Sequence, residues 1–241
     1  MVFGKIMVLI MYKLKGIYIG LCYCGNEIGK PALYLDVYGC NRKCNYCVQN
    51  YFHKNDIYDS TRYITYGIND LLFIISEFNY KNIIIGGSGE PTIQDFSELI
   101  NILNNANYNV IIETNGKKYS KDLELCDTII FNIKTFSAGT PYTKRDDMDW
   151  YKNKFSKCVF TCTIKNMKDI DYLADNFSDY DLWLFLEFDE LDFNPYLEKI
   201  LNYDNWRICL RMDRILNLDF KSVHNKRGDL NGRETTSFSS I

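Results

Sequence analysis

The stretch Ala32–Cys47, ALYLDVYGCNRKCNYC, joins a strand pattern directly to three clustered cysteines. Its first half, Ala32–Tyr38, is rich in strand-forming residues. Its second half has the spacing C-x3-C-x2-C, with thiols at Cys40, Cys44 and Cys47. Three thiolates at this spacing wrap a loop around a small soft-metal centre. The stretch therefore predicts a strand whose carboxyl end carries a metal centre.

Three protein thiolates leave one iron of a [4Fe–4S] cluster without a protein ligand, so that iron is open to a chelator such as the amino and carboxylate groups of an amino acid. Two other interpretations stay open at this point. One is a structural zinc site, for which His53 is the only nearby histidine. The other is three unligated core cysteines.

Strand patterns recur along the chain and alternate with helical ones. Short apolar runs predict further strands at Asn82–Ile85, Val110–Glu113, Thr128–Ile133, Cys158–Ile164, Leu182–Phe188 and Trp206–Met212. Apolar residues at helical spacing predict helices at Asp70–Asn79, Asp95–Asn105, Lys168–Asn176 and Pro195–Tyr203. Such alternation is typical of a parallel sheet covered by helices. We predict an α/β fold, a single-domain partial barrel of about six strand–helix units with its chemistry at the carboxyl ends of the strands.

Composition excludes several classes of protein. The 241 residues carry 28 Lys+Arg against 31 Asp+Glu, and 46% of them are hydrophobic, which argues against disorder and against a nucleic-acid partner. No apolar run approaches the ~20 residues needed to cross a bilayer, so no membrane partner is expected. The nine cysteines are odd in number and clustered, unlike a secreted disulfide framework. We therefore expect a protein of the reducing cytoplasm.

The domain boundaries are expected near the two ends of the chain. Residues 1–15 are interpreted as an N-terminal extension, with Met11 as an alternative start of the protein. Residues 16–219 form the predicted domain, and the polar residues 220–241 are expected to be a disordered tail.

Other predicted strand ends also carry chemistry-bearing residues. The glycine turn Gly86–Pro91, GGSGEP, allows a ligand to approach the backbone closely, and the Glu90 carboxylate suits an ammonium group. The alternative is a simple strand-to-helix turn. Glu113 is a candidate for ribose hydroxyls or substrate, or merely ends its strand before the Asn115-Gly116 turn. Lys134 suits a ligand carboxylate, or is a surface lysine.

Together these motifs resemble the radical S-adenosylmethionine (SAM) superfamily, whose hallmark is C-x3-C-x-Φ-C with an aromatic residue before the last cysteine, here Tyr46. The resemblance implies a [4Fe–4S] cluster on the three cysteines and SAM on the open iron. One electron then cleaves SAM to methionine and a 5′-deoxyadenosyl radical. It also implies that the turn, with one serine more than the family's Gly-Gly-Glu-Pro, binds the SAM amino group. The residues expected to contact the cofactors are Tyr46, Gly87, Ser88, Gly89, Glu90, Glu113, Asn115, Asn132 and Lys134, with Glu90 and Lys134 as catalytic residues.

Within this superfamily the chain resembles the 7-carboxy-7-deazaguanine synthases of queuosine biosynthesis, carbon–nitrogen lyases that contract 6-carboxytetrahydropterin. Matching segments include Gly29–Ala32, Glu113–Gly116, Asn132–Gly139 and Asn205–Arg207. The departures fall on the pterin and Mg2+ side, because Asp36 replaces a carboxylate-binding arginine and Val48-Gln49 replaces the Asp-Thr pair that binds Mg2+. Mg2+ is therefore left open. The expected substrate contacts are Cys22, Tyr23, Asp36, Arg211 and Arg214.

Two alternative functions are carried forward. A glycyl-radical-enzyme activating protein shares the Gly-Cys-Asn motif and Asn50 shortly after the third cysteine. A non-catalytic Fe–S or zinc protein would not need the glycine turn. For a radical SAM enzyme the expected partners are a pterin-like small molecule and an electron donor such as flavodoxin or ferredoxin, with a homodimer as one expected state. Cys22 and Cys24 are considered as a second metal site, whereas Cys126, Cys158, Cys162 and Cys209 are expected in the core.

Overall fold

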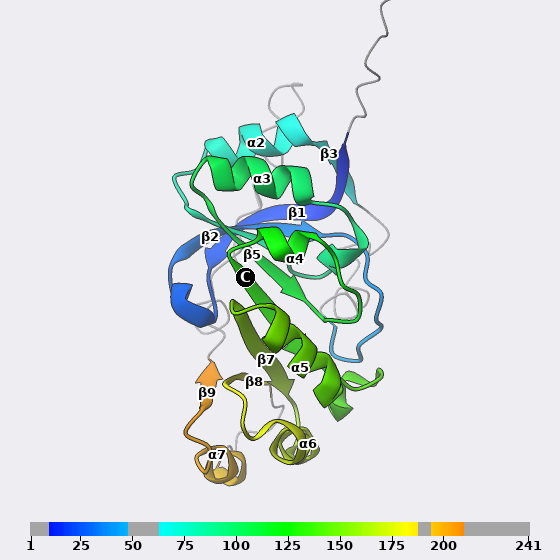
Figure 1. The fold of residues 1–241 in the computed structure, drawn as a ribbon, viewed down its shortest axis with the longest axis vertical. Helices are drawn as coiled ribbons and strands as arrows, with labels where there is room; N and C mark the ends of the chain where they lie inside the picture. Colours follow the sequence, from blue (N-terminus) through cyan, green and yellow to red (C-terminus); the bar gives the residue numbers. More distant parts are fainter. Residues whose placement is uncertain (1–9, 48–62, 188–193, 210–241) are drawn as a thin grey trace, which may run out of the picture.

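The computed structural model describes residues 10–47, 63–187 and 194–209. In this part of the chain one sheet has the strand order β3-β1-β2-β4-β5-β6-β7-β8-β9 (Figure 1). Seven of these strands form a continuous parallel run. They are β2 (Pro31–Val37), β4 (Asn82–Gly86), β5 (Asn109–Thr114), β6 (Thr128–Ile133), β7 (Cys158–Ile164), β8 (Leu182–Leu186) and β9 (Trp206–Cys209). The predicted α/β fold with an open, partial barrel is confirmed.

Two further strands lie at the edge next to β2. Strand β1 (Met11–Leu21) runs antiparallel to β2 and to the short edge strand β3 (Ile64–Gly67). Residues 11–15, expected to belong to the N-terminal extension, therefore form the first part of a sheet strand, in which Tyr12 and Leu14 are buried. The local pattern did not predict this, because Lys13, Lys15 and Gly16 interrupt the apolar run. Residues 1–9 and 210–241 lie outside the described residues.

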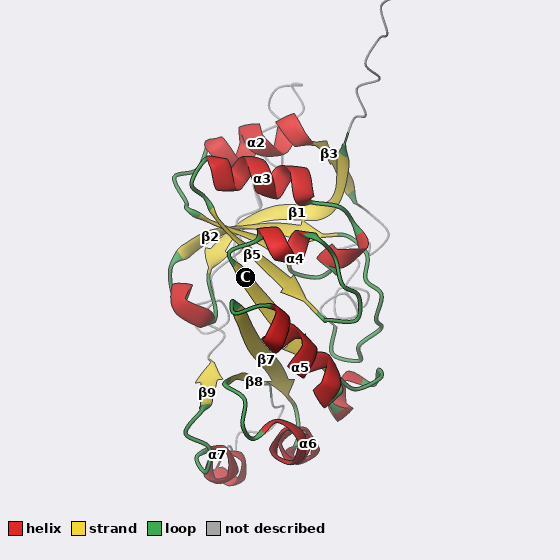
Figure 2. Cartoon of the chain, viewed as in Figure 1, coloured by secondary structure: helices red, strands yellow, loops and turns green. Residues whose placement is uncertain are grey.

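The helices all contribute to one apolar core on one face of the sheet (Figure 2). They are α2 (Ile68–Ser76), α3 (Ser97–Asn105), α4 (Asp122–Leu125), α5 (Arg145–Lys154), α6 (Met167–Phe177) and α7 (Asn194–Ile200). Helices α4 and α5 were not predicted. Helix α4 is a single turn, and α5 is polar except for the buried Met148 and Tyr151 and the exposed Trp150. None of the helices described is both long and apolar enough to cross a membrane.

Alternation along the strands separates two cores. In β4, Ile83 and Ile85 pack in the core under the helices, whereas Ile84 packs in a second cluster on the opposite face. In β5, Ile111 belongs to that second cluster, and its neighbours in sequence face the helices. Because side chains alternate with a period of two, these positions also decide on which face of the sheet the other residues of each strand lie. The face without helices, called the inner face below, is the one on which a ligand can lie.

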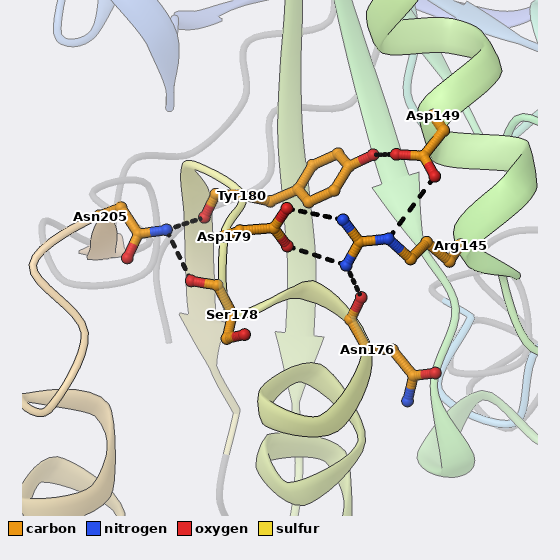
Figure 3. A network of polar contacts seen from close by, with 7 residues as sticks. All are labelled: Arg145, Asp149, Asn176, Ser178, Asp179, Tyr180 and Asn205. Carbon is orange, nitrogen blue, oxygen red and sulfur yellow. Dashed lines mark hydrogen bonds and ion pairs between the residues drawn. The ribbon is translucent and has the colours of Figure 1, made fainter.

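The opposite edge of the sheet is tied together by a polar network (Figure 3). Arg145 of α5 donates two hydrogen bonds to Asp179, at 2.9 and 2.6 Å, and one to the Asn176 carbonyl oxygen. The Tyr180 hydroxyl bonds Asp149, and Asn205 donates to the carbonyl oxygens of two residues before β8. These contacts join α5 to the loops that enter β8 and β9. They lie at the amino ends of the strands, away from the residues expected to be functional.

Candidate active site

The inner face changes from apolar to polar toward the carboxyl ends of the strands. Ala32, Ile84, Ile111 and Ile130 form part of its buried apolar cluster. Further along the same strands and on the same face come the polar or small residues Asp36, Gly86, Glu113 and Asn132. The alternation of β-strands thus places several of the predicted site residues around one rim.

The glycine turn is bonded to two carboxylates of this rim. The Gly87 backbone N–H donates to Glu113 Oε2 at 3.0 Å. Ser88 donates to Asp36 Oδ1 through its backbone N–H at 2.7 Å and its hydroxyl at 2.6 Å. A Cβ atom at Gly86 would lie 2.6 Å from the Cβ of Glu113, so this position requires glycine. Ser88, the residue by which the turn exceeds the family motif, is therefore paired with Asp36, the residue that replaces the arginine.

Asp36 supports a pH prediction. Burial raises the pKa of its carboxyl, and the two bonds from Ser88 counteract this only in part. A raised pKa in the folded state means that burying the carboxylate costs stability above that pKa, and that this cost disappears as the pH falls through it. In Asp36→Asn we expect the free energy of unfolding to increase less as the pH falls, and to be equal to or higher than that of the unsubstituted protein at pH 7. Urea unfolding at several pH values measures both. Exposed Asp146→Asn is the matched control, and an unaltered pH profile in Asp36→Asn would contradict the prediction.

Behind the glycine turn, the strand ends are joined by Glu90. Its backbone N–H donates to the Gly39 carbonyl oxygen at 2.8 Å, directly before the cysteine loop. Its carboxylate is 1% exposed. Oε1 accepts hydrogen bonds from the N–H and hydroxyl of Thr92 and from the Thr114 hydroxyl, and Oε2 accepts one from the Asn115 N–H at 2.8 Å. Glu90 thus holds the end of β5 against the turn, while its expected contact with SAM stays a prediction.

Gly89 is packed against backbone and supports a stability prediction. A Cβ atom there would lie 2.1 Å from the Val37 carbonyl oxygen and 2.7 Å from that of Gly39. We expect Gly89→Ala to lower the free energy of unfolding by about 3 kcal/mol or more, because backbone cannot move aside as a side chain can. Gly29→Ala is the comparison: φ there is +79° with no atom within 4 Å, so only a backbone strain of about 1 kcal/mol is expected. Equal losses in denaturant unfolding would show that the contact with backbone does not matter.

The cysteine loop is anchored to the segments that follow two strands, β5 and β6. The Asn45 N–H donates to the Ala138 carbonyl oxygen at 2.8 Å, and Arg42 donates to that of Pro141 at 2.6 Å, both after β6. Lys117, after β5, donates to the Asn41 carbonyl oxygen at 2.8 Å. Of the three thiols, Cys40 is exposed, Cys44 is buried and Cys47 is intermediate. The loop is therefore held at its flanks, and the first of its three cysteines is the exposed one.

Tyr46 and Lys134 lie together beside this loop. The Lys134 Nζ atom is 5.7 Å from the centre of the Tyr46 ring, within cation–π range. Among the described residues the Tyr46 hydroxyl is buried without a hydrogen-bond partner. Burial also raises its pKa, so it stays protonated. An orphaned buried hydroxyl next to a cation is what a bound polar ligand would complete. Asn132 lies in β6, two residues before Lys134, and its Oδ1 accepts a hydrogen bond from Thr161 of the neighbouring strand β7 at 3.0 Å.

The donor set fits a [4Fe–4S] cluster. Three thiols on one anchored loop supply three ligands, and the polar rim next to them leaves a place for a chelator of the fourth iron. Nowhere in the described ranges do three His, Cys, Asp or Glu side chains converge on a single metal ion. A cubane spreads its ligands over different irons, so its thiols need not converge in this way. The alternative zinc ligand His53, and Val48-Gln49 at the position of the Mg2+ motif, lie outside the described residues.

The expected substrate contacts are only partly brought together. The Tyr23 hydroxyl hydrogen-bonds Glu113, and burial together with this carboxylate raises its pKa well above the usual value. Cys22 lies in the apolar cluster of the inner face, together with Cys24 and Cys209. It is 3% exposed. Among the described residues no group of three metal ligands gathers around Cys22 and Cys24, and the second metal site that we considered stays a prediction. Arg211 and Arg214 lie outside the described residues.

The remaining cysteines lie where they were predicted, whereas three threonines of the site were not predicted. Cys126, Cys162 and Cys209 are buried and Cys158 packs against the main core, as predicted. Thr92, Thr114 and Thr161 were missed as members of the site. The period of two along β7 could have placed Thr161 on the inner face, but nothing local shows that the hydroxyls of Thr92 and Thr114 meet on Glu90.

Comparison with known proteins agrees with this site. The sequence profile of the radical SAM superfamily matches residues 34–163. A 7-carboxy-7-deazaguanine synthase of Neisseria meningitidis is 32% identical over 109 residues, 44% of this chain and 45% of that protein. A Methanocaldococcus jannaschii protein, named as a glycyl-radical enzyme activating enzyme, is 37% identical over 170 residues, 60% of this chain and 62% of its own. The chain thus spans less than two thirds of either relative.

Among solved structures, the crystal structure of QueE from Escherichia coli superposes with a TM-score of 0.62. The superposition covers 83% of this chain and 94% of QueE, at 17% sequence identity. At that identity the similarity establishes the fold alone.

Proposed function

Because the chain belongs to the radical SAM superfamily, we propose that it binds a [4Fe–4S] cluster through Cys40, Cys44 and Cys47 and binds SAM across the adjoining rim. When bound, the cluster supplies the electron that cleaves SAM to methionine and a 5′-deoxyadenosyl radical. The observation that carries the proposal is the junction at Gly39, where the Glu90 N–H bonds the residue before Cys40. Through this contact the cysteine loop and the glycine turn form one unit.

Different residues of the chain are proposed to bind different groups of SAM. The carbonyl oxygens of the turn Gly87–Glu90 are the proposed acceptors for the SAM ammonium group. Lys134, next to the Tyr46 ring, is the proposed partner of the SAM carboxylate. Asn132 and Glu113 lie on the same rim and are proposed to contact the rest of the molecule. The apolar cluster beneath them excludes water from the reacting centre, which a radical intermediate requires.

For the overall reaction we propose a synthase-type ring contraction of a pterin such as 6-carboxytetrahydropterin. The support is the similarity to the N. meningitidis synthase and the motifs that the chain shares with that family. One contact must differ, because Asp36 cannot attract a substrate carboxylate. Two anions at ~4 Å repel by roughly 1–4 kcal/mol, depending on the effective dielectric constant. Arg211 or Arg214 is proposed to supply the compensating positive charge.

Activation of a glycyl-radical enzyme is the second candidate. The observation that favours it is the M. jannaschii relative, which matches a longer stretch at higher identity than the N. meningitidis synthase does. The acidic rim is also compatible with a peptide, because the Asp36 carboxylate can accept hydrogen bonds from backbone N–H groups. In either reaction a reductant is needed, and flavodoxin or ferredoxin is the proposed donor.

The test is anaerobic reconstitution with iron and sulfide, reduction, addition of SAM, and quantification of 5′-deoxyadenosine with and without 6-carboxytetrahydropterin. Formation that depends on Cys44, with conversion of the pterin to a deazaguanine, is the expected result. Cleavage that depends on Cys44 but is indifferent to the pterin would keep SAM cleavage and discard this substrate. Absence of both cluster and cleavage would overturn the proposal as a whole.

A further inference from the structure

The side chain of Asn115 connects the end of β5 to the cysteine loop. Its Nδ2 atom lies 3.7 Å from Cys40 Sγ, within hydrogen-bond range for sulfur, and 2.8 Å from Asn41 Oδ1. Its Oδ1 atom accepts from the Lys117 N–H at 3.0 Å and from Arg42 Nε at 3.3 Å. Both of those groups are donors only, so they hold the amide oxygen on their side. The NH2 group must therefore face the sulfur.

The backbone of Asn115 is held as well. Its N–H donates to Glu90 Oε2, and its side chain is almost fully buried, with the whole residue 7% exposed. Cys40, by contrast, is the exposed thiol of the three. The Cys40 thiol also accepts a hydrogen bond from the Arg42 backbone N–H. The buried Asn115 amide adds a second donor from another part of the chain, and the two together fix the position of the sulfur.

We propose that Asn115 is a positioning residue for the cluster, which donates an N–H···S hydrogen bond to Cys40 and raises the reduction potential. This inference rests on the proposed function, because it requires a cluster on the three cysteines. A hydrogen bond to a ligating sulfur withdraws negative charge from the cluster and so favours the reduced state. Asn115 was expected to contact SAM, whereas its amide is already committed to the loop.

The variant Asn115→Asp tests the inference with little change of shape. Aspartate keeps an oxygen for Arg42 and Lys117 but replaces the donor by an acceptor that repels the thiolate. Asn45→Asp is the matched control, because it adds the same charge to the exposed part of the loop, where no bond to sulfur is made. The measurement is the midpoint potential of the cluster by redox titration followed by electron paramagnetic resonance, with iron content measured in parallel.

We expect Asn115→Asp to disfavour reduction at least tenfold more than Asn45→Asp does, a difference of about 59 mV for a one-electron couple. Equal shifts in the two variants would overturn the inference, since charge alone would then explain them. Unsubstituted protein that takes up no iron would refute the proposed function and this inference together. A cluster of normal content without the differential shift would refute the inference alone.

A second measurement does not depend on the folding of the variant. Protein labelled with 15N-asparagine is reduced, and the hyperfine coupling of nitrogen to the cluster is recorded by pulsed electron paramagnetic resonance. We expect a coupling that survives in Asn41→Ala and Asn45→Asp, which removes these neighbours as its source. The absence of any asparagine coupling would contradict the N–H···S bond.

Discussion

Cys44→Ala is expected to abolish binding of the cluster and, with it, cleavage of SAM. The iron content should fall from about four per chain, and 5′-deoxyadenosine should fall to the level found without protein. The physical reason is the position of Cys44, which is the buried middle thiol of the three on the loop. Iron and sulfide analysis, visible absorption and product quantification check the prediction.

The matched control for this prediction is Cys126→Ala. Cys126 is also buried, 2% exposed, but it packs near α4 and donates weakly to the Leu123 carbonyl oxygen. Its loss should cost some stability and leave the iron content unchanged. A cluster that persists in Cys44→Ala, or that disappears equally in both variants, would remove the assignment of the cysteine loop.

Glu90→Gln is expected to lower the stability of the protein strongly, although it changes the shape of the side chain very little. The glutamate oxygens accept four hydrogen bonds from Thr92, Thr114 and Asn115 in a buried place. An amide presents an NH2 group to one of these donors and also removes the charge that strengthens the other bonds. We expect the free energy of unfolding to fall by about 3 kcal/mol in denaturant titration.

Glu98→Gln on the exposed side of α3 is the control for Glu90→Gln, and it should change stability by less than about 0.5 kcal/mol. The cluster loop should also loosen in Glu90→Gln, because the Asn115 N–H donates to the Glu90 carboxylate and the Asn115 side chain contacts the loop. A variant as stable as the unsubstituted protein would show that Glu90 is kept free for a ligand, as the sequence motif suggested.

The sequence predicted the parallel strands well, because each is a short apolar run whose pattern is local. It did not predict β1 and β3 as sheet strands, because Lys13, Lys15 and Gly16 interrupt the apolar run of β1 and because β3 has only four residues. Helix α5 was missed for another reason: only a narrow strip of it is apolar, so its propensity to pack shows only against the sheet. The motif residues at the strand ends were found because strand ends and motifs are both local features.

The amino-acid sequence by itself determined the chemistry available to this protein. Cysteine spacing, a glycine turn and a lysine after a strand are contiguous patterns, and the bond-forming capacity of each group belongs to the residue. Only the tertiary structure decided which of these groups already form hydrogen bonds with distant parts of the chain. Asp36 meets Ser88 over 52 residues, and Asn115 meets Cys40 over 75. Such contacts depend on the order of strands in the sheet, which side-chain alternation converts into one rim and which no local pattern contains.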